Sequence, residues 1–332
     1  MASPPVAAAT RQRSPMQAIA VLLVLAAAAT MPFIVSSFHL LQLTMVVIYS
    51  IALLGLNILT GYNGQISLGH GAFYAIGAYT TAILLDYTGL PYWAAIAVAG
   101  GLCLLVGFLF GLPALRLEGL YLALSTFALA VATPQLLKFH ALEEWTGGVQ
   151  GRYVSAFSPP FGLPLAWDQW LYLFSLAVAA ILFLLAWNLL RGSTGLAITA
   201  IRDNPIAAVS MGINISLYKS LTFGVSAMYT GIAGGLGALV TQFVAPDSFT
   251  VFLSLGLLVG SVIGGVSSIS GAIFGAFFIQ FVPNVADQIS KAVTWAVYGS
   301  VLIALMYLAP TGISGFLAMI VRRLREWRKV RP

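Results

Sequence analysis

The sequence has very few charged residues. They make up 7% of its 332 residues, whereas 60% are hydrophobic. A soluble domain carries roughly a quarter charged residues, so this composition excludes an ordinary soluble protein and indicates a membrane protein with several spans. The basic excess, 15 Lys and Arg against 9 Asp and Glu, comes from the tail after Val321 and does not indicate a nucleic-acid-binding surface.

Groups that carry catalytic, metal or nucleotide chemistry are also scarce. The single Cys103 excludes an internal disulfide and a cysteine metal cluster, and we expect it to be a small core residue. The three histidines lie far apart, and no Gly-Lys pair exists to form a nucleotide-binding P-loop. We therefore predict no enzyme, no cofactor and no metal site. If ATP drives this protein, a separate polypeptide must bind it.

Long apolar runs dominate the chain and predict an all-α, polytopic transmembrane helical bundle of about eight to ten spans. Runs near the length of about 20 residues that a spanning helix needs lie at about 17–35, 40–59, 70–85, 92–112, 119–137, 169–190, 217–241, 249–266, 269–285 and 293–309. The first run also fits a signal peptide, but it continues through Val35, which favours a retained span. We expect residues 1–16 to be disordered.

The basic residues predict the orientation of these spans. With the N-terminus inside, alternation leaves Lys138, Arg152 and Lys291 outside and the other basic residues inside, as the positive-inside rule requires. Both termini are then cytoplasmic, with residues 17–312 as the membrane domain and 313–332 as a basic cytoplasmic tail. Residues 138–168 form an outer loop, and residues 191–216 form a cytoplasmic loop.

The stretch from 57 to 71 joins two apolar runs and places four glycines among uncharged polar side chains. Glycine lets a helix break, and broken helices at membrane depth often mark a solute path. We therefore predict a broken junction whose path-lining candidates are Asn57, Tyr62, Asn63, Gln65, Ser67 and His70. The alternative is a short polar loop at the membrane surface. No acid neighbours His70, which favours a hydrogen-bonding role in the path or in helix packing over a metal ligand or proton relay.

The cytoplasmic loop predicts two short helices, one over about 194–202 and one that begins at Pro205 after Asn204 and ends at Gly212. The exposed apolar residues of the second helix suit the groove of a partner protein. An amphipathic pair that lies on the membrane surface is the alternative. The candidate residues for coupling to a partner are Arg202, Asp203, Asn204, Pro205, Ala207, Ala208 and Gly212.

Several motifs resemble one family. The segment Gly55–Phe73 fits the pattern G-x-N-x-x-x-G-x-x-G-x-x-S-x-G-H-x-x-F, which resembles the signature of permease subunits of branched-chain amino acid ABC importers. The segment from Gly195 to Asn214 is similar to the coupling segment of the same family, although Ile206 stands where the wider EAA-type loop has Glu. The segments Gly119–Thr126 and Thr146–Gly151 resemble the second of the two permease types in such importers.

The resemblance implies a transport subunit that carries branched-chain amino acids across a bacterial inner membrane. Its implied partners are a second homologous permease, two ATPase subunits, a periplasmic or lipid-anchored substrate-binding protein, and membrane lipid, with no nucleic acid. Two alternatives remain open: a permease for urea, short amides or other amino acids, and a stand-alone channel or ion-coupled carrier. Ion-coupled carriers commonly keep ionisable groups mid-span, and here every acid lies at a span end or in a loop, which disfavours proton coupling.

Overall fold

The computed structural model describes residues 15–330 except 116, 118, 156–163 and 290–293. The prediction of an all-α membrane bundle is confirmed. The only strands in the described part are β1 (Arg152–Tyr153) and β2 (Phe243–Val244), which pair antiparallel with Arg152 opposite Val244. The predicted disorder of residues 1–16 falls outside the described residues except for Pro15 and Met16, which begin a helix.

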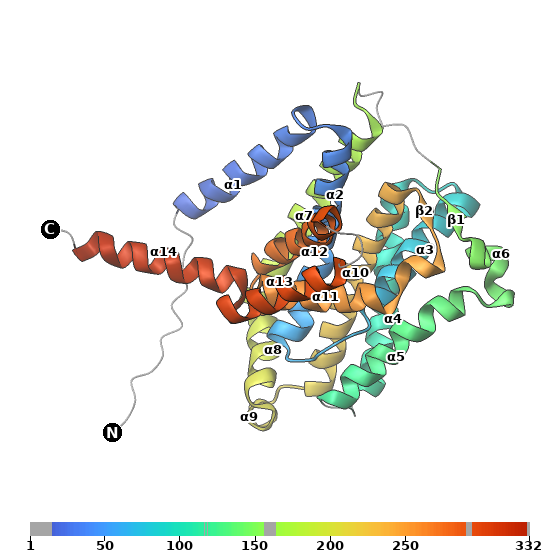
Figure 1. The fold of residues 1–332 in the computed structure, drawn as a ribbon. Helices are drawn as coiled ribbons and strands as arrows, with labels where there is room; N and C mark the ends of the chain where they lie inside the picture. The colour runs from blue at the N-terminus through green and yellow to red at the C-terminus, as the bar shows by residue number, and fades with distance from the viewer. Residues whose placement is uncertain (1–14, 116, 118, 156–163, 290–293, 331–332) are drawn as a thin grey trace.

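Each predicted apolar run coincides with a helix (Figure 1). The helices that match the ten runs are α1 (Pro15–Thr30), α2 (Ser37–Leu56), α3 (His70–Thr88), α4 (Tyr92–Ala114), α5 (Leu120–Leu137), α7 (Trp167–Arg191), α10 (Ile215–Thr241), α11 (Val251–Gly264), α12 (Gly271–Ile289) and α13 (Thr294–Leu308). Short helices and turns connect them: η1 (Met31–Phe33), η2 (Asn57–Tyr62), η3 (His140–Leu142), α6 (Glu143–Thr146), η4 (Gly148–Gln150), α8 (Ser193–Asp203), α9 (Pro205–Ser210) and η6 (Pro246–Phe249). Helix α14 (Gly312–Val330) ends the described chain.

Several of these helices are long and apolar enough to cross a bilayer on their own. Among the described residues there are 6 such segments, which cover 37–62, 92–114, 120–137, 167–191, 215–241 and 246–264. Helix α12 is a shorter apolar helix by the same measure, over 271–285. The chain is therefore a multi-pass membrane protein.

Helix α10 lies at the centre of the bundle and packs against α2, α3 and α4. Glycines permit this contact because they let helix backbones approach each other directly. A Cβ added to Gly77 of α3 would lie 2.0 Å from the carbonyl oxygen of Gly231 in α10. A Cβ on Gly231 would in turn lie 2.4 Å from the Cys103 sulfur. Cys103 is thus a buried core residue, as the sequence predicted.

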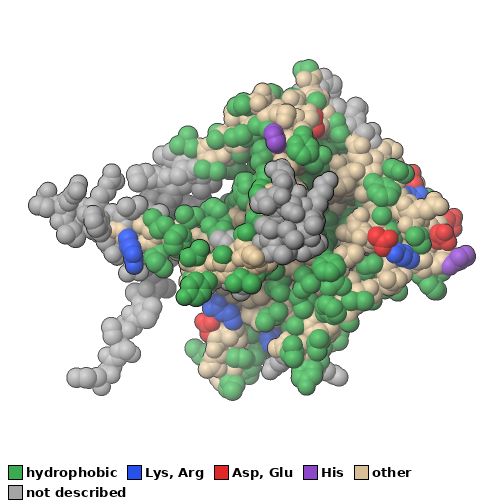
Figure 2. All heavy atoms as spheres, viewed as in Figure 1, with side chains coloured by type: hydrophobic (Ala, Val, Ile, Leu, Met, Phe, Trp, Pro, Cys, Tyr) green, Lys and Arg blue, Asp and Glu red, His purple; other side chains and the backbone are tan. Residues whose placement is uncertain are grey.

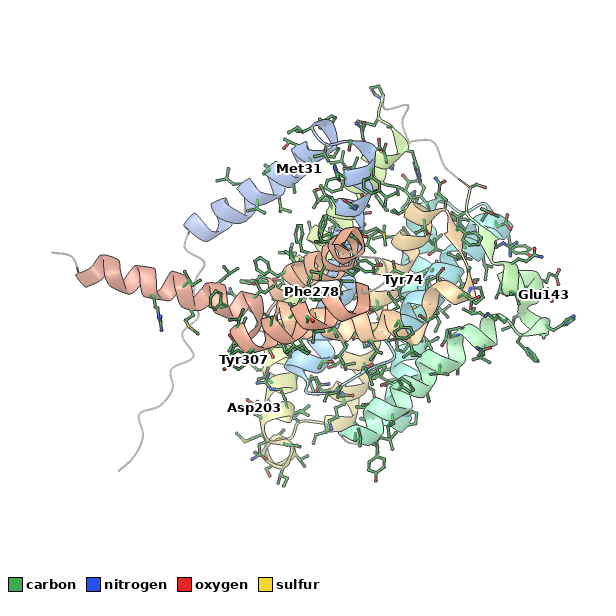
Figure 3. All side chains as sticks on the ribbon, viewed as in Figure 1. Met31, Tyr74, Glu143, Asp203, Phe278 and Tyr307 are labelled. Atoms are coloured by element: carbon green, nitrogen blue, oxygen red, sulfur yellow. The ribbon has the colours of Figure 1, made fainter. Side chains whose placement is uncertain are left out.

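Most of the charged side chains in view lie in two groups, one at the right and one at the lower left, with hydrophobic surface between them (Figure 2). Glu143 lies at the end formed by α6, and Asp203 lies at the end formed by α8 and α9 (Figure 3). At the first end Lys138 pairs with Asp247 at 2.6 Å, and Arg152 pairs with Asp86. These ion pairs join the connections that follow α3, α5 and α10. Alternation of the predicted spans assigns all three connections to one side of the membrane.

The contact between α3 and α10 predicts that Gly77→Val destabilises the bundle. The new side chain collides with the backbone of α10, and overpacking of this kind costs about 1–3 kcal/mol. The measurement is the thermal unfolding midpoint in detergent. Gly101→Val in α4 is the matched control because no described atom lies within 4 Å of a Cβ at that position. Equal midpoints for the two variants would contradict the direct helix contact.

Candidate functional site

The predicted broken junction is present, and it begins with a change of helix type. Helix α2 runs into η2, which is a π-helix over Asn57–Tyr62. Such wide turns are rare and occur frequently at functional sites. After η2 the chain is irregular until α3 begins at His70, and Gly64 adopts a left-handed conformation with φ of 73°. The backbone N–H of Gln65 donates a hydrogen bond to the Leu59 carbonyl at 3.2 Å, and this bond closes the break.

Asn57 fastens the start of the π-helix to a neighbouring hairpin of helices. Its Nδ2 donates to the Ser268 carbonyl at 3.1 Å, and its Oδ1 accepts from the Ser261 hydroxyl. Ser261 belongs to α11, and Ser268 lies in the turn between α11 and α12. Asn57 is fully buried. The side chain therefore holds α2 against the α11–α12 turn.

His70 stands in a buried chain of hydrogen bonds that crosses from the junction to α10. Its Nδ1 lies 2.9 Å from Ser67 Oγ, and its Nε2 lies 2.6 Å from Ser226 Oγ. Ser226 donates to the Gly55 carbonyl at 2.6 Å, so its oxygen must accept from the ring. His70 therefore carries its proton on Nε2 and accepts from Ser67 at Nδ1. Ser67 in turn accepts from the Gly69 amide at 3.3 Å.

Backbone amides at the start of α3 and just before it find partners on other helices. The N-cap, Gly69, has no side chain to offer, although a helix start leaves free N–H groups that need acceptors. Ser254 of α11 accepts from the Gly71 amide at 2.9 Å. Thr126 of α5 accepts from the Leu68 amide at 2.9 Å. The junction is thus fixed by polar side chains from α5, α10 and α11.

The other candidate path residues lie where the junction meets the start of α10. Gln65 is buried and donates to the Lys219 carbonyl at 3.4 Å. Asn63 is 3% exposed, and neither polar atom of its side chain has a hydrogen-bond partner in the described part of the chain. Tyr62 is half-buried, whereas Ile66 is 46% exposed. Five of the six predicted path residues are therefore buried within this chain.

Sequence reasoning missed the residues that complete the site, namely Thr126, Ser226, Ser254, Ser261 and Ser268. Four of them are small hydroxyl residues inside apolar helices, which is a visible signal. Their partners depend on how the helices pack, and the sequence alone does not give that packing.

The loop of residues 191–216 forms the two predicted helices, α8 and α9. Asn204 caps α9 by accepting from the Ala207 amide at 3.1 Å, and Pro205 occupies the first turn. Gly212 is left-handed with φ of 79° and ends the segment. Helix α8 buries Ile198 and Ile201 against the bundle.

Helix α9 divides its side chains between the bundle and the surface. Ile206, Val209 and Met211 are 81%, 57% and 84% exposed. Ala208 is only 3% exposed, so it faces this chain. The role of Ala208 in coupling to a partner stays a prediction. Arg202 and Asp203 pair at 2.9 Å.

The connection between α5 and α7 is also held in place by specific contacts. Arg152 pairs with Asp86 and lies over the ring of Tyr87, 4.7 Å from its centroid. Partial burial lowers the pKa of Arg152, but hydrogen bonds to Tyr87 and Asp86 raise it more, so the guanidinium stays charged. Exposed aromatic side chains on this surface include Phe139, Trp145 and Tyr153.

Comparison with known proteins agrees with this architecture. The model of the family described as branched-chain amino acid transport system / permease component matches residues 38–310. The chain belongs to this family. The match covers the helices from α2 to α13 and therefore includes both the junction and the loop that contains α8 and α9.

Two curated relatives of this permease have the name high-affinity branched-chain amino acid transport system permease protein LivM. The protein from Salmonella typhimurium is 36% identical over 259 residues, which cover 70% of this chain and 60% of the relative. The Escherichia coli protein is 38% identical over 254 residues, which cover 69% of this chain and 58% of the relative. The matched part of the permease thus spans about 60% of the length of these relatives. No solved structure matches the chain.

The hydrogen-bond chain through His70 predicts that His70→Leu destabilises the permease. Leucine leaves the hydroxyl groups of Ser67 and Ser226 without their ring partner, and each unsatisfied buried group costs about 1–3 kcal/mol. The thermal unfolding midpoint in detergent should fall, and transport should fall with it. His39→Leu is the control, because His39 is exposed at the start of α2. An unchanged midpoint for His70→Leu would contradict the structural role.

Proposed function

We propose that this chain is the membrane-spanning permease subunit of an ATP-driven importer that carries branched-chain amino acids inward across a bacterial inner membrane. The family match over residues 38–310, which takes in nearly the whole bundle, carries this proposal. The chain has no nucleotide-binding P-loop, so ATP hydrolysis belongs to separate ATPase subunits. A second homologous permease and a periplasmic or lipid-anchored binding protein complete the importer.

The orientation in this proposal has both termini and α8–α9 in the cytoplasm. Two sets of contacts support it, because each set joins segments that alternation assigns to the same side. Lys138 pairs with Asp247, and Arg152 pairs with Asp86, at the outer end. Gly61, Arg202 and Ser267 come together at the inner end. Cysteine labelling at exposed positions 155 and 193, in a variant without Cys103, tests the orientation, and labelling of position 193 from outside intact cells would overturn it.

The solute path in this proposal runs beside the junction. Asn63 supports it, because a buried amide without a protein partner is free to exchange hydrogen bonds with a passing ligand or water. Tyr62 and Gln65 flank Asn63 and add further uncharged hydrogen-bonding groups. Asn57, Ser67 and His70 hold the wall of the path in shape from behind.

Helix α9 is the contact surface for an ATPase subunit in this proposal. Ile206, Val209 and Met211 form an exposed apolar surface on a short helix that stands at the cytoplasmic end. Short amphipathic helices bind a partner by placing such a face in a groove. Leu196 of α8, which is 71% exposed, lies in the same loop.

The substrate assignment predicts ATP-dependent uptake of branched-chain amino acids. The complete importer, reconstituted in vesicles with its binding protein, should accumulate labelled leucine when ATP is present. Competition by unlabelled isoleucine and valine, but not by urea or short amides, is the expected result. Uptake of leucine without ATP, or under an ion gradient alone, would favour the channel or carrier alternative.

The contact surface predicts that the double variant Ile206→Ser/Met211→Ser releases the ATPase. Loss of two exposed apolar anchors should lower ATPase co-purification by about tenfold or more, since anchors of this kind contribute at least about 1–2 kcal/mol each. Leu217→Ser is the matched control, because Leu217 is an exposed apolar residue in the first turn of α10. Co-purification equal to the control would show that the partner binds elsewhere.

A further inference from the structure

The guanidinium group of Arg202 joins three segments that are far apart in the sequence. Its Nη1 donates to the Gly61 carbonyl at 2.8 Å and to the Ser267 hydroxyl at 3.3 Å. Ser267 donates to the same Gly61 carbonyl at 2.6 Å. One carbonyl of the π-helix therefore receives a hydrogen bond from α8 and another from the α11–α12 turn. We call these three residues the Gly61 node.

The backbone around this node leaves no room for other side chains. A Cβ on Gly61 would lie 2.4 Å from the Ser267 amide nitrogen. A Cβ on Gly64, which is left-handed, would lie 2.8 Å from Cγ of Arg202. Ser267 itself has φ of 66°, which is uncommon for a residue other than glycine. The surroundings thus hold the node in one arrangement, and a shift of one segment must move the others.

Arg202 is connected to the exposed face of α9 through a short and rigid route. It lies in the last turn of α8, and α9 begins two residues after its neighbour Asp203. Asn204 joins the two helices and caps α9. Ile198 and Ile201 are both buried, so α8 packs on the bundle between α9 and the Gly61 node.

We propose that Arg202 is a positioning residue that passes movement of the cytoplasmic helices to the broken junction through the Gly61 node. The inference rests on the proposed function, because the movement comes from the ATPase subunits. A planar guanidinium suits this role because its several N–H groups point in fixed directions, so it can hold the Gly61 carbonyl and the Asp203 carboxylate at once. Lysine offers a point charge and does not reproduce that geometry.

The experiment compares Arg202→Gln and Arg202→Lys with Arg191→Gln in the complete reconstituted importer. Arg191 is a matched control because it is an exposed arginine at the same end of the bundle, stacked over Trp187 at 3.9 Å. Arg202→Gln should keep ATPase co-purification but lower the solute transported per ATP by about tenfold, the factor expected for the loss of one charge-assisted hydrogen bond. The transport per ATP of Arg202→Lys should lie between that of Arg202→Gln and that of the parent protein. The control, Arg191→Gln, should match the parent protein.

A second readout follows the junction itself. Ile66→Cys, in a Cys103→Ser background that retains uptake, places a reporter at an exposed junction position. Addition of ATP should change its labelling rate when Arg202 is present and should not change it in Arg202→Gln. If Arg202 had a purely structural role, Arg202→Gln would change the labelling rate by the same amount with and without ATP. The response of position 66 to ATP would then be preserved.

Three results would overturn the inference: unchanged transport per ATP in Arg202→Gln, a preserved ATP response at position 66, or loss of ATPase co-purification, which would assign Arg202 to the partner surface. If Arg202→Gln does not fold in the membrane, Ser267→Ala decides. This variant removes the other donor to the Gly61 carbonyl and should lower the solute transported per ATP. A value equal to that of the parent protein would overturn the inference. Failure of the proposed function is distinguishable, because the importer with Arg202 intact would then show no ATP-driven uptake.

Discussion

The structure depends on one constraint: backbone polar groups that a helix break exposes inside an apolar bundle must find other partners. Each unsatisfied group in such surroundings costs several kcal/mol. At the junction after α2, the partners are the side chains of Thr126, Ser254 and Ser267 and the guanidinium of Arg202. The break therefore decides where α5, α8 and α11 lie, because each of them supplies a group that the broken backbone needs.

The same constraint explains why the junction is polar without being open. Asn57, Ser67 and His70 look like ligand-binding residues in the sequence, because they are hydrogen-bonding groups in an apolar region. In the structure their hydrogen-bonding capacity is used within the chain. Asn63 differs from them, since its side-chain amide has no partner in the described residues. Which polar side chains of the junction have a structural role thus depends on partners that come from other helices.

Much of the fold could be predicted from the sequence. Apolar runs gave the helices, and the Asn204-Pro205 cap and Gly212 gave the ends of α9, because these depend on residues close together in the chain. The polar partners of the junction could not be predicted. Ser226 meets His70 across 156 positions, and Ser261 meets Asn57 across 204 positions, so those contacts exist only after the helices pack. The inward position of Ala208 likewise depends on how α9 sits on the bundle, which local patterns do not specify.

The Gly61 node also shows why a backbone carbonyl is an effective point of contact between moving parts. A side chain can change rotamer and absorb a displacement, whereas a main-chain carbonyl moves only with its helix turn. Arg202 and Ser267 both bond to such a carbonyl, at the end of a π-helix where the regular hydrogen-bond ladder is already interrupted. Glycine at 61 and 64 removes the side chains that would otherwise keep the arginine and the turn away from the backbone. A displacement of α8 therefore acts directly on the end of α2, and through Asn57 and the α11–α12 turn it extends to the next helix pair.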